Sequence, residues 1–292
     1  MEAKRYADKI GKPSTAAFHI QPQNLWSSVG LGKVDWIQDG TYRSFRTFLY
    51  NKFRHIHAPS QFMADEIKKR GYTAKIHVIS NGIQDAFLEA GHLVHQQGRP
   101  AKSPEFEGKI PIMMIGRLSQ EKRQDVLINA VRYSKYADKI QLIFAGKGPK
   151  FEQYRDLGFK LRHIPQFVYV EQERLIQLLL QCDLYVHASD MESEAISCIE
   201  AFATGLVPVI ANSEVSATPQ FALDGRSLFR AGSSKDLARA IDYWLDHPNE
   251  REYMSELYRV AAKRYSLANS VRMFEDMLNE EIEDNAKLSV QA

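Results

Sequence analysis

The amino-acid sequence predicts two α/β domains, each built on a parallel sheet. Short apolar runs rich in β-branched residues alternate with amphipathic helical segments along most of the chain. The runs are apolar throughout, as is typical of strands in a parallel sheet whose two faces are both covered. The length of 292 residues allows two modest hydrophobic cores. In such sheets, ligands bind beyond the carboxyl ends of the strands.

The second half of the chain shows this alternation most clearly. It predicts four strands, which are residues 112–115, 141–145, 184–187 and 208–211. It also predicts six helices, which are residues 124–134, 150–157, 172–181, 196–204, 234–246 and 248–264. These elements indicate a doubly wound domain.

The first 90 or so residues follow the same pattern with fewer elements. The expected strands are residues 15–18, 55–58 and 76–79, and the expected helices are residues 42–53 and 60–70. Three strands without a clear opening strand predict an incomplete sheet. The polar residues 92–104 are interpreted as a linker, and residues 266–287 as a final helix. We therefore predict a partial first domain (1–98), a second domain (99–265) and a C-terminal helical segment (266–292).

Composition and charge indicate which partners and which cellular compartment the protein could have. The net charge of +2 does not require a nucleic-acid partner, although residues 1–70 hold 12 Lys and Arg against 6 Asp and Glu. This basic N-terminal segment could favour an anionic surface, or it is simply a solvated face. The two cysteines, Cys182 and Cys198, stand in apolar context and predict buried thiols in a reducing cytoplasm. The opening MEAKRYADKIGK lacks the apolar region of a signal peptide. We expect a cytoplasmic protein, peripheral at most at the inner face of the membrane.

The stretch GRLSQEK (residues 116–122) follows a predicted buried strand. Its glycine, Gly116, ends the strand, and Arg117 and Lys122 follow in the loop. Two cations at this edge of a parallel sheet suit a phosphate, because Arg offers a planar fork and Lys a point charge. The alternative is that they are ordinary solvated loop cations.

The next strand ends in AGKGP (residues 145–149). Gly146 and Gly148 give the G-x-G of a dinucleotide-binding turn, but the third glycine and the acidic ribose ligand of that motif are missing. A plain tight turn explains the pair, and the sequence gives no support for a nicotinamide cofactor.

A third loop, in MESEAISCIE (residues 191–200), holds two carboxylates eight positions apart. Glu192 lies before a predicted helix and Glu200 about one turn inside it. The free N–H groups of that helix start suit a phosphate, and a carboxylate beside a ribose accepts its hydroxyl protons. The alternative is a pair of acids that merely favour the helix dipole.

The order of these motifs resembles a known family. GRLSQEK, AGKGP, HASDMESEAISCIEAFATGLVPVIA and DGRSLF follow one another as in the C-terminal domain of retaining glycosyltransferases of family 4. Glu192 and Glu200 match that family's E-x7-E signature. In the first half, HIHAPSQFMADEIKKRGY and HVISNGI resemble the end of the family's first domain, and His19 in TAAFHIQPQN matches its cleft histidine. The resemblance spans residues 12–276.

The resemblance implies a GT-B fold of two Rossmann-like domains with parallel sheets, the first one incomplete, and a last helix that returns toward the first domain. It implies catalytic roles for Arg117, Lys122, Glu192 and His19. The cations would neutralise the departing diphosphate, while Glu192 and His19 would contact the donor. It further implies a set of donor-binding residues, namely Gly116, Gly146, Gly148, Ser193, Glu194, Ala195, Ile196 and Glu200. We expect no metal and no cofactor besides a UDP- or GDP-sugar substrate.

Two departures from the family pattern concern the loop and the start of the chain. Ser193, Glu194 and Ala195 stand where the family often has Gly-Phe-Gly, so Glu194 is interpreted as a contact to sugar hydroxyls or as a surface residue. The glycine-rich turn of the family's first domain has no counterpart, and roughly the first 90 to 110 residues of that domain are missing by comparison. Residues 41–54 interleave aromatics with cations, which suits either an anionic membrane or a helix packed on the first domain.

The function that these features imply is that of a hexosyltransferase. It would move a sugar from a nucleotide sugar to a glycan or a lipid-linked acceptor with retention of configuration, in the synthesis of cell-envelope polysaccharide or glycolipid. One alternative is a catalytically inactive, truncated remnant that still binds nucleotide sugars. Another is a different GT-B enzyme, such as an epimerase or a phosphorylase, which the E-x7-E order disfavours.

Overall fold

The computed structural model describes residues 2–27 and 34–291 and divides into two compact units. The first unit comprises residues 1–82 and 267–292, and the second comprises residues 83–266. The chain has an α/β fold with parallel sheets, as the sequence predicts.

The second unit contains a six-stranded parallel sheet in the order β6-β5-β4-β7-β8-β9. Its strands are β4 (Ile110–Ile115), β5 (Ile140–Ala145), β6 (Gln166–Val168), β7 (Leu184–His187), β8 (Pro208–Asn212) and β9 (Leu228–Arg230). In chain order this is the 3-2-1-4-5-6 arrangement of doubly wound dinucleotide-binding domains. The order reverses between β4 and β7, so a crevice for a ligand is expected where these two strands end.

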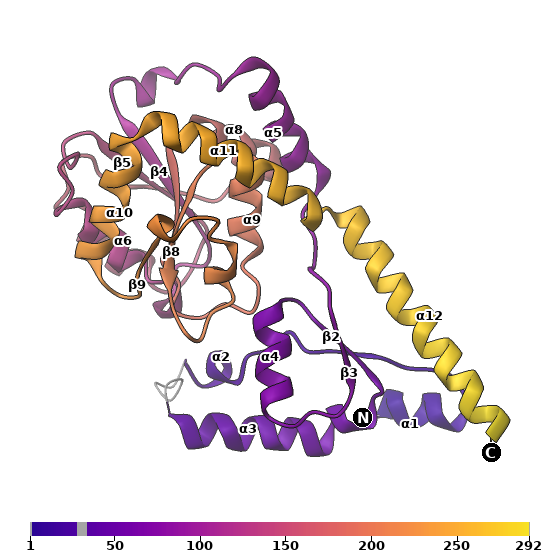
Figure 1. Ribbon diagram of the computed structural model, residues 1–292. Coiled ribbons are helices and arrows are strands. Elements are labelled where there is room, and N and C mark those ends of the chain that lie inside the picture. The colour runs from indigo at the N-terminus through magenta and orange to yellow at the C-terminus, as the bar shows by residue number, and fades with distance from the viewer. Residues whose placement is uncertain (1, 28–33, 292) are drawn as a thin grey trace. The chain divides into compact units, whose positions relative to one another are not determined.

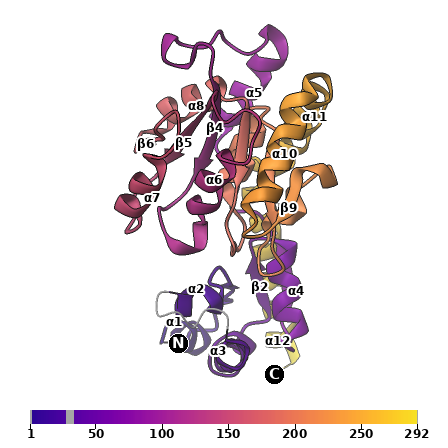
Figure 2. The same ribbon diagram turned by 90° about the vertical axis from the view of Figure 1, so that its left-hand side faces the viewer.

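Seven helices of the described residues surround this sheet (Figures 1 and 2). They are α5 (Asp85–Gln97), α6 (Gln124–Val131), α7 (Phe151–Gly158), α8 (Gln172–Gln181), α9 (Ile196–Ala203), α10 (Ser234–Asp246) and α11 (Pro248–Ala262). One group packs α6 against α7 and α10, and another packs α9 against α5 and α11. Right-handed crossovers place the two groups on opposite faces of the sheet. The core between them includes the fully buried side chains Phe106, Phe144, Phe202, Trp244 and Tyr258.

The first unit contains a three-stranded parallel sheet in the order β1-β2-β3. Its strands are β1 (Ala16–Ala17), β2 (His55–Ala58) and β3 (Lys75–Val78). Its helices are α1 (Glu2–Lys9), α2 (Pro22–Ser27), α3 (Asp35–Phe48), α4 (Gln61–Lys69) and α12 (Leu267–Gln291). Aromatic rings dominate the small core, where Phe18 contacts the rings of Tyr42, Tyr50 and Tyr72.

The four strands predicted for the second half and the three predicted for the first half are all confirmed within two residues. The short strands β6 and β9 were missed. They lie at the two edges of the sheet and have three residues each, too few to give a period. The linker predicted at residues 92–104 is wrong in its first part, because α5 continues to Gln97. Gly91 inside this helix permits close packing, since a Cβ there would lie 1.9 Å from the carbonyl oxygen of Ala203 on α9.

Candidate active site

Two loops of the second unit meet where the strand order reverses. The loop after β4 holds Gly116, Arg117 and Lys122, and the loop after β7 holds Glu192. Strands β4 and β7 are hydrogen-bonded neighbours, with Ile112 opposite Leu184. The carboxyl ends of parallel strands lie at one edge of the sheet. The sheet therefore brings together two motifs that are 70 positions apart in the sequence.

Glu192 lies where the two loops meet. Its Oε1 is 2.6 Å from Nζ of Lys122 and 2.9 Å from Nε2 of His187. Burial by itself would raise the pKa of Glu192, but Lys122 and His187 together lower it to about 2. The carboxylate is therefore ionised at neutral pH. Both contacts end on Oε1, and in the described part of the chain no hydrogen bond reaches Oε2.

A chain of hydrogen bonds fixes His187 at the end of β7. Its Nδ1 is 3.1 Å from the hydroxyl of Tyr185, which in turn lies 3.2 Å from Oγ of Ser197 on α9. His187 and Tyr185 are both fully buried. Because one ring nitrogen faces Tyr185 and the other faces Glu192, the imidazole has little freedom to rotate. This arrangement holds the Glu192 carboxylate in one orientation.

Glu200 lies on the same helix as Ser197, one turn further along. Burial raises its pKa to about 7. Its carboxylate makes no ion pair with any residue in the ranges 2–27 and 34–291. A half-buried acid without a counter-ion is held in a costly state, which is typical of a functional site. Glu200 is thus partly protonated at neutral pH, unlike Glu192.

The helix α9 begins after a residue in an unusual conformation. Ala195, its N-cap, has φ of 71° and ψ of 60°, in the left-handed region that favours glycine. Ala195 thus stands where the family that the sequence resembles often has a glycine, and its backbone is strained. This conformation turns the chain sharply from the Glu192 loop into α9, whose first N–H groups lack intrahelical acceptors.

The two glycines of AGKGP allow the loop after β5 to pack on the loop after β4. A Cβ on Gly146 would lie 2.1 Å from the carbonyl oxygen of Gly116, and a Cβ on Gly148 would lie 2.3 Å from that of Leu118. The amide of Leu118 donates to the carbonyl of Lys147 at 3.0 Å. Close backbone packing therefore accounts for both glycines, and their contact with a donor stays a prediction.

The remaining predicted residues fall into different environments. Arg117 is exposed, and its guanidinium makes no ion pair within the described residues. Ser193 is half-buried, and Ile196 opens α9. Glu194 is only 3% exposed, so the interpretation of it as a surface residue is wrong.

His19 belongs to the first unit, where its Nε2 lies 3.2 Å from Nδ1 of His57. Burial and, to a lesser degree, His57 lower the pKa of His19. Its role at the donor stays a prediction.

Three residues that sequence reasoning missed also shape this site. His187 could have been found, because it is the last residue of a predicted strand and such positions face the ligand edge. No motif in the sequence points to Arg123 or Asp190. Nη1 of Arg123 lies 3.1 Å from Oδ2 of Asp190, and the amide of Asp190 donates to the carbonyl of Glu121 at 2.8 Å. These contacts tie the loop after β7 to the loop after β4.

The parallel α/β architecture, with its doubly wound second unit, is that of glycosyltransferases of the GT-B type. The family model "Glycosyl transferases group 1" matches residues 96–259, which is more than half of the chain. A second model, "Glycosyltransferase Family 4", matches residues 3–87. The chain belongs to the group 1 glycosyltransferases.

Solved structures and curated relatives agree with this assignment. The catalytic domain of cholesterol-α-glucosyltransferase from Helicobacter pylori is 49% identical, over 54% of this chain and 99% of that domain, with a TM-score of 0.52. HepE from Anabaena, solved with UDP-glucose, is 17% identical over 95% of this chain and 75% of its own, with a TM-score of 0.75. An α-monoglucosyldiacylglycerol synthase from Streptococcus pneumoniae is 24% identical over 218 residues, or 71% of this chain. The chain spans only 32% to 48% of the length of the curated relatives that it matches.

Proposed function

We propose that the chain transfers a glucosyl group from UDP-glucose to the hydroxyl group of a lipid acceptor, with retention of anomeric configuration. The observation that carries the proposal is the ionised Glu192, held through one oxygen by Lys122 and His187 at the switch point of the sheet. In the reaction the bond between C1 of glucose and the diphosphate breaks. A bond from C1 to the acceptor oxygen forms, and the hydroxyl proton is released.

The donor sugar is assigned to Glu192. Oε2 of this carboxylate is the oxygen that a sugar hydroxyl can approach, because Oε1 already accepts from Lys122 and His187. An ionised carboxylate only accepts hydrogen bonds, which suits hydroxyl donors. The low pKa of Glu192 keeps it in that state throughout the neutral range.

The leaving diphosphate is assigned to Arg117 and Lys122. Arg117 is exposed at the carboxyl end of β4, and Lys122 is half-buried beside it in the same loop. Their charges, with the N–H groups at the start of α9, would stabilise the negative charge that develops as the sugar departs. These groups supply the electrostatic stabilisation without a metal ion. Glu200 is assigned to the hydroxyls of the ribose, which a carboxylate binds well.

A lipid acceptor is supported by the relatives and by the surface of α3. Two of the similar proteins are named for lipids, one as a cholesterol-α-glucosyltransferase and the other as an α-monoglucosyldiacylglycerol synthase. Helix α3 buries Tyr42 in the core of the first unit, while Trp36 and Phe48 are 77% and 67% exposed. Phe48 follows Arg43 and Arg46 in the last turns of the helix, whereas Trp36 stands between Asp35 and Asp39. Exposed aromatics near cations suit an anionic membrane surface. None of the described helices is long and apolar enough to cross a membrane.

A transfer assay tests the proposal. The full chain is incubated with radiolabelled UDP-glucose and with cholesterol or diacylglycerol in anionic vesicles, and the lipid product is isolated. The anomeric configuration is then read by NMR. Arg117→Ala and Lys122→Ala should abolish transfer, while Arg162→Ala, an exposed cation elsewhere in the same unit, should not. Unchanged turnover in both site variants would refute the assignment.

The same assay separates transfer from simple binding. Donor binding by calorimetry without transfer or donor hydrolysis would favour the alternative of a nucleotide-sugar-binding module.

The proposed membrane contact is measured separately, by sedimentation of the chain with anionic vesicles. Replacing Trp36 and Phe48 together by Ser should weaken vesicle binding at least about tenfold. Two aromatic side chains that become buried in the membrane surface contribute well over about 1.4 kcal/mol.

A further inference from the structure

Four histidines lie on or beside the sheet of the first unit, and two of them meet three acids of α12. His55 on β2 and His77 on β3 come from neighbouring parallel strands, with Nδ1 of His55 2.8 Å from Nε2 of His77. Oε2 of Glu280, on α12, lies 3.7 Å from the same Nε2 of His77. One nitrogen or oxygen from each of the three residues falls within 4.8 Å of the other two. Two imidazoles and a carboxylate are a ligand set that Zn²⁺ and similar ions favour.

The second nitrogen of His55 is oriented by carboxylates. Nε2 lies 3.3 Å from Oδ2 of Asp284 and 3.6 Å from Oε2 of Glu281. A carboxylate accepts, so Nε2 of His55 carries the proton and Nδ1 presents its lone pair toward His77. A carboxylate behind a histidine is the usual outer partner of a metal-bound imidazole, because it fixes the tautomer and the ring orientation. This feature distinguishes the cluster from a chance group of surface histidines.

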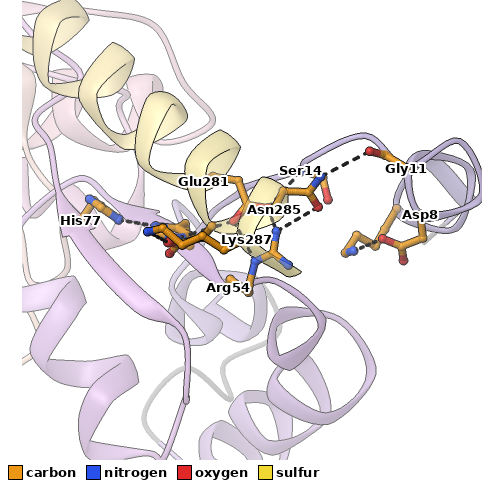
Figure 3. A network of polar contacts seen from close by, with 11 residues as sticks. Asp8, Gly11, Ser14, Arg54, His77, Glu281, Asn285 and Lys287 are labelled. Carbon is orange, nitrogen blue, oxygen red and sulfur yellow. Dashed lines mark hydrogen bonds and ion pairs between the residues drawn. The ribbon is translucent and has the colours of Figure 1, made fainter. Parts of the chain in front are cut away.

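Helix α12 is itself fixed at this point by a separate contact. Arg54, the residue before β2, donates from Nε and Nη2 to the two oxygens of Glu281, with the Nε contact at 3.1 Å. The backbone amide of Ser14 also donates to Glu281, and Arg54 reaches Asn285 at 3.2 Å (Figure 3). Glu281 is only 3% exposed. The next residue toward the N-terminus, Glu280, is thereby held beside β3.

The distances allow a tetrahedral ion after movements of up to about 1.5 Å, since the ligand atoms of His55 and Glu280 lie within 4.8 Å and must come to about 3.3 Å. Zn–N bonds of about 2.0–2.1 Å and tetrahedral angles put two ligand nitrogens about 3.3 Å apart. The nitrogens of His55 and His77 must separate by about half an ångström, and Glu280 must approach His77 by about 0.3 Å, relative to their distances of 2.8 Å and 3.7 Å. The buried His55 forms the floor, whereas Glu280 is 37% exposed and leaves a path for entry. Lys75 is paired with Glu280 and would compete with the ion.

We propose that His55, His77 and Glu280 bind a divalent transition-metal ion of the Zn²⁺ type, which fastens α12 to strands β2 and β3. The site shares no residue with the donor site proposed in the second unit, since all its ligands belong to the first unit. It departs from the sequence-based expectation of no metal. The ligands are 22 and 203 positions apart and form no spacing motif, so only the fold brings them together.

Calorimetric titration of the metal-stripped full chain with Zn²⁺ tests the site. One equivalent should bind with micromolar or tighter affinity. His77→Gln and Glu280→Gln should each weaken binding by about 100-fold or more, and Asp284→Asn by about 10- to 100-fold, the effect typical of outer partners. Lys75→Gln should tighten binding, because it removes the competing cation. His163→Gln, at a half-buried histidine of the second unit, is the matched control and should change nothing.

A second readout reports the coordination itself. Co²⁺ bound by two imidazoles and a carboxylate in a tetrahedral site gives a strong visible absorption band, which should vanish in His77→Gln. Circular dichroism checks that each variant is folded. Glu280→Gln, at a partly exposed position, keeps the test decisive if His77→Gln does not fold. Binding that is unchanged in the folded site variants, or no binding at micromolar Zn²⁺, would overturn the proposal.

Discussion

Replacing Glu200 by Gln should make the stability of the second unit less sensitive to pH. Burial raises the pKa of Glu200 from 4.5 to about 7. The folded state therefore keeps a proton that the unfolded chain has already lost. Stability contributed by this group is fully present below about pH 4.5 and is lost as pH rises through about 7. Glutamine cannot ionise, so the variant escapes this loss.

The magnitude follows from the two pKa values. Each unit of pKa difference corresponds to about 1.36 kcal/mol, so the full shift gives about 3 kcal/mol above pH 8. At about pH 5.5 only about 1.4 kcal/mol of this has been lost. The difference in unfolding free energy between the variant and the wild type should therefore grow by about 2 kcal/mol between about pH 5.5 and pH 8.

Urea denaturation followed by tryptophan fluorescence measures this difference. Trp244 is fully buried in the second unit, whereas Trp26 and Trp36 belong to the first. Both of the latter are replaced by Phe in all proteins, so that the signal reports the second unit alone. Glu173→Gln, on the exposed face of α8, is the control. A difference between Glu200→Gln and the wild type that does not vary with pH would refute the reasoning.

Three further predictions concern residues of the candidate active site. Lys122→Gln should destabilise the second unit by about 3 kcal/mol, because Glu192 is left as a buried charge with one partner fewer; adding Glu192→Gln should restore most of the loss in urea denaturation, and strictly additive effects would contradict the pairing. Gly146→Ala should cost about 3 kcal/mol and weaken UDP binding, since its Cβ would lie 2.1 Å from a carbonyl oxygen; a wild-type melting curve would show that the loops repack freely. Ala195→Gly should stabilise by up to about 1 kcal/mol, because it relieves the left-handed conformation; a destabilised variant would indicate that the buried methyl group matters more.

The strands and helices of the second unit could be predicted because each is a continuous apolar run or a regular amphipathic period. The six-residue β5 is buried along its whole length and gives an unbroken signal. The edge strands β6 and β9 give none, because they are short and only partly buried. Helix α5 was mistaken for a linker beyond residue 91, since its polar end is exposed and only its start is packed.

Only the residues of the candidate site that belong to a recognisable motif could be predicted from the sequence. Arg117, Lys122 and Glu192 were found because each follows an apolar strand, and parallel strands end at one edge. The inward contact of His187 with Glu192 depends on which face of β7 each side chain takes, and a continuous apolar strand does not reveal this. The His55, His77 and Glu280 cluster lay beyond sequence reasoning altogether, because it combines two strands with a helix more than 200 residues away.

A crystal structure of the full chain with UDP is the most direct test of the central claim, that the crevice between β4 and β7 holds a nucleotide-sugar donor. The account predicts the diphosphate beside Arg117, Lys122 and the first turn of α9, with the ribose hydroxyls on Glu200. Oε2 of Glu192 should face the place of the missing sugar. A nucleotide bound elsewhere on the chain, with the Glu192 loop untouched, would contradict it.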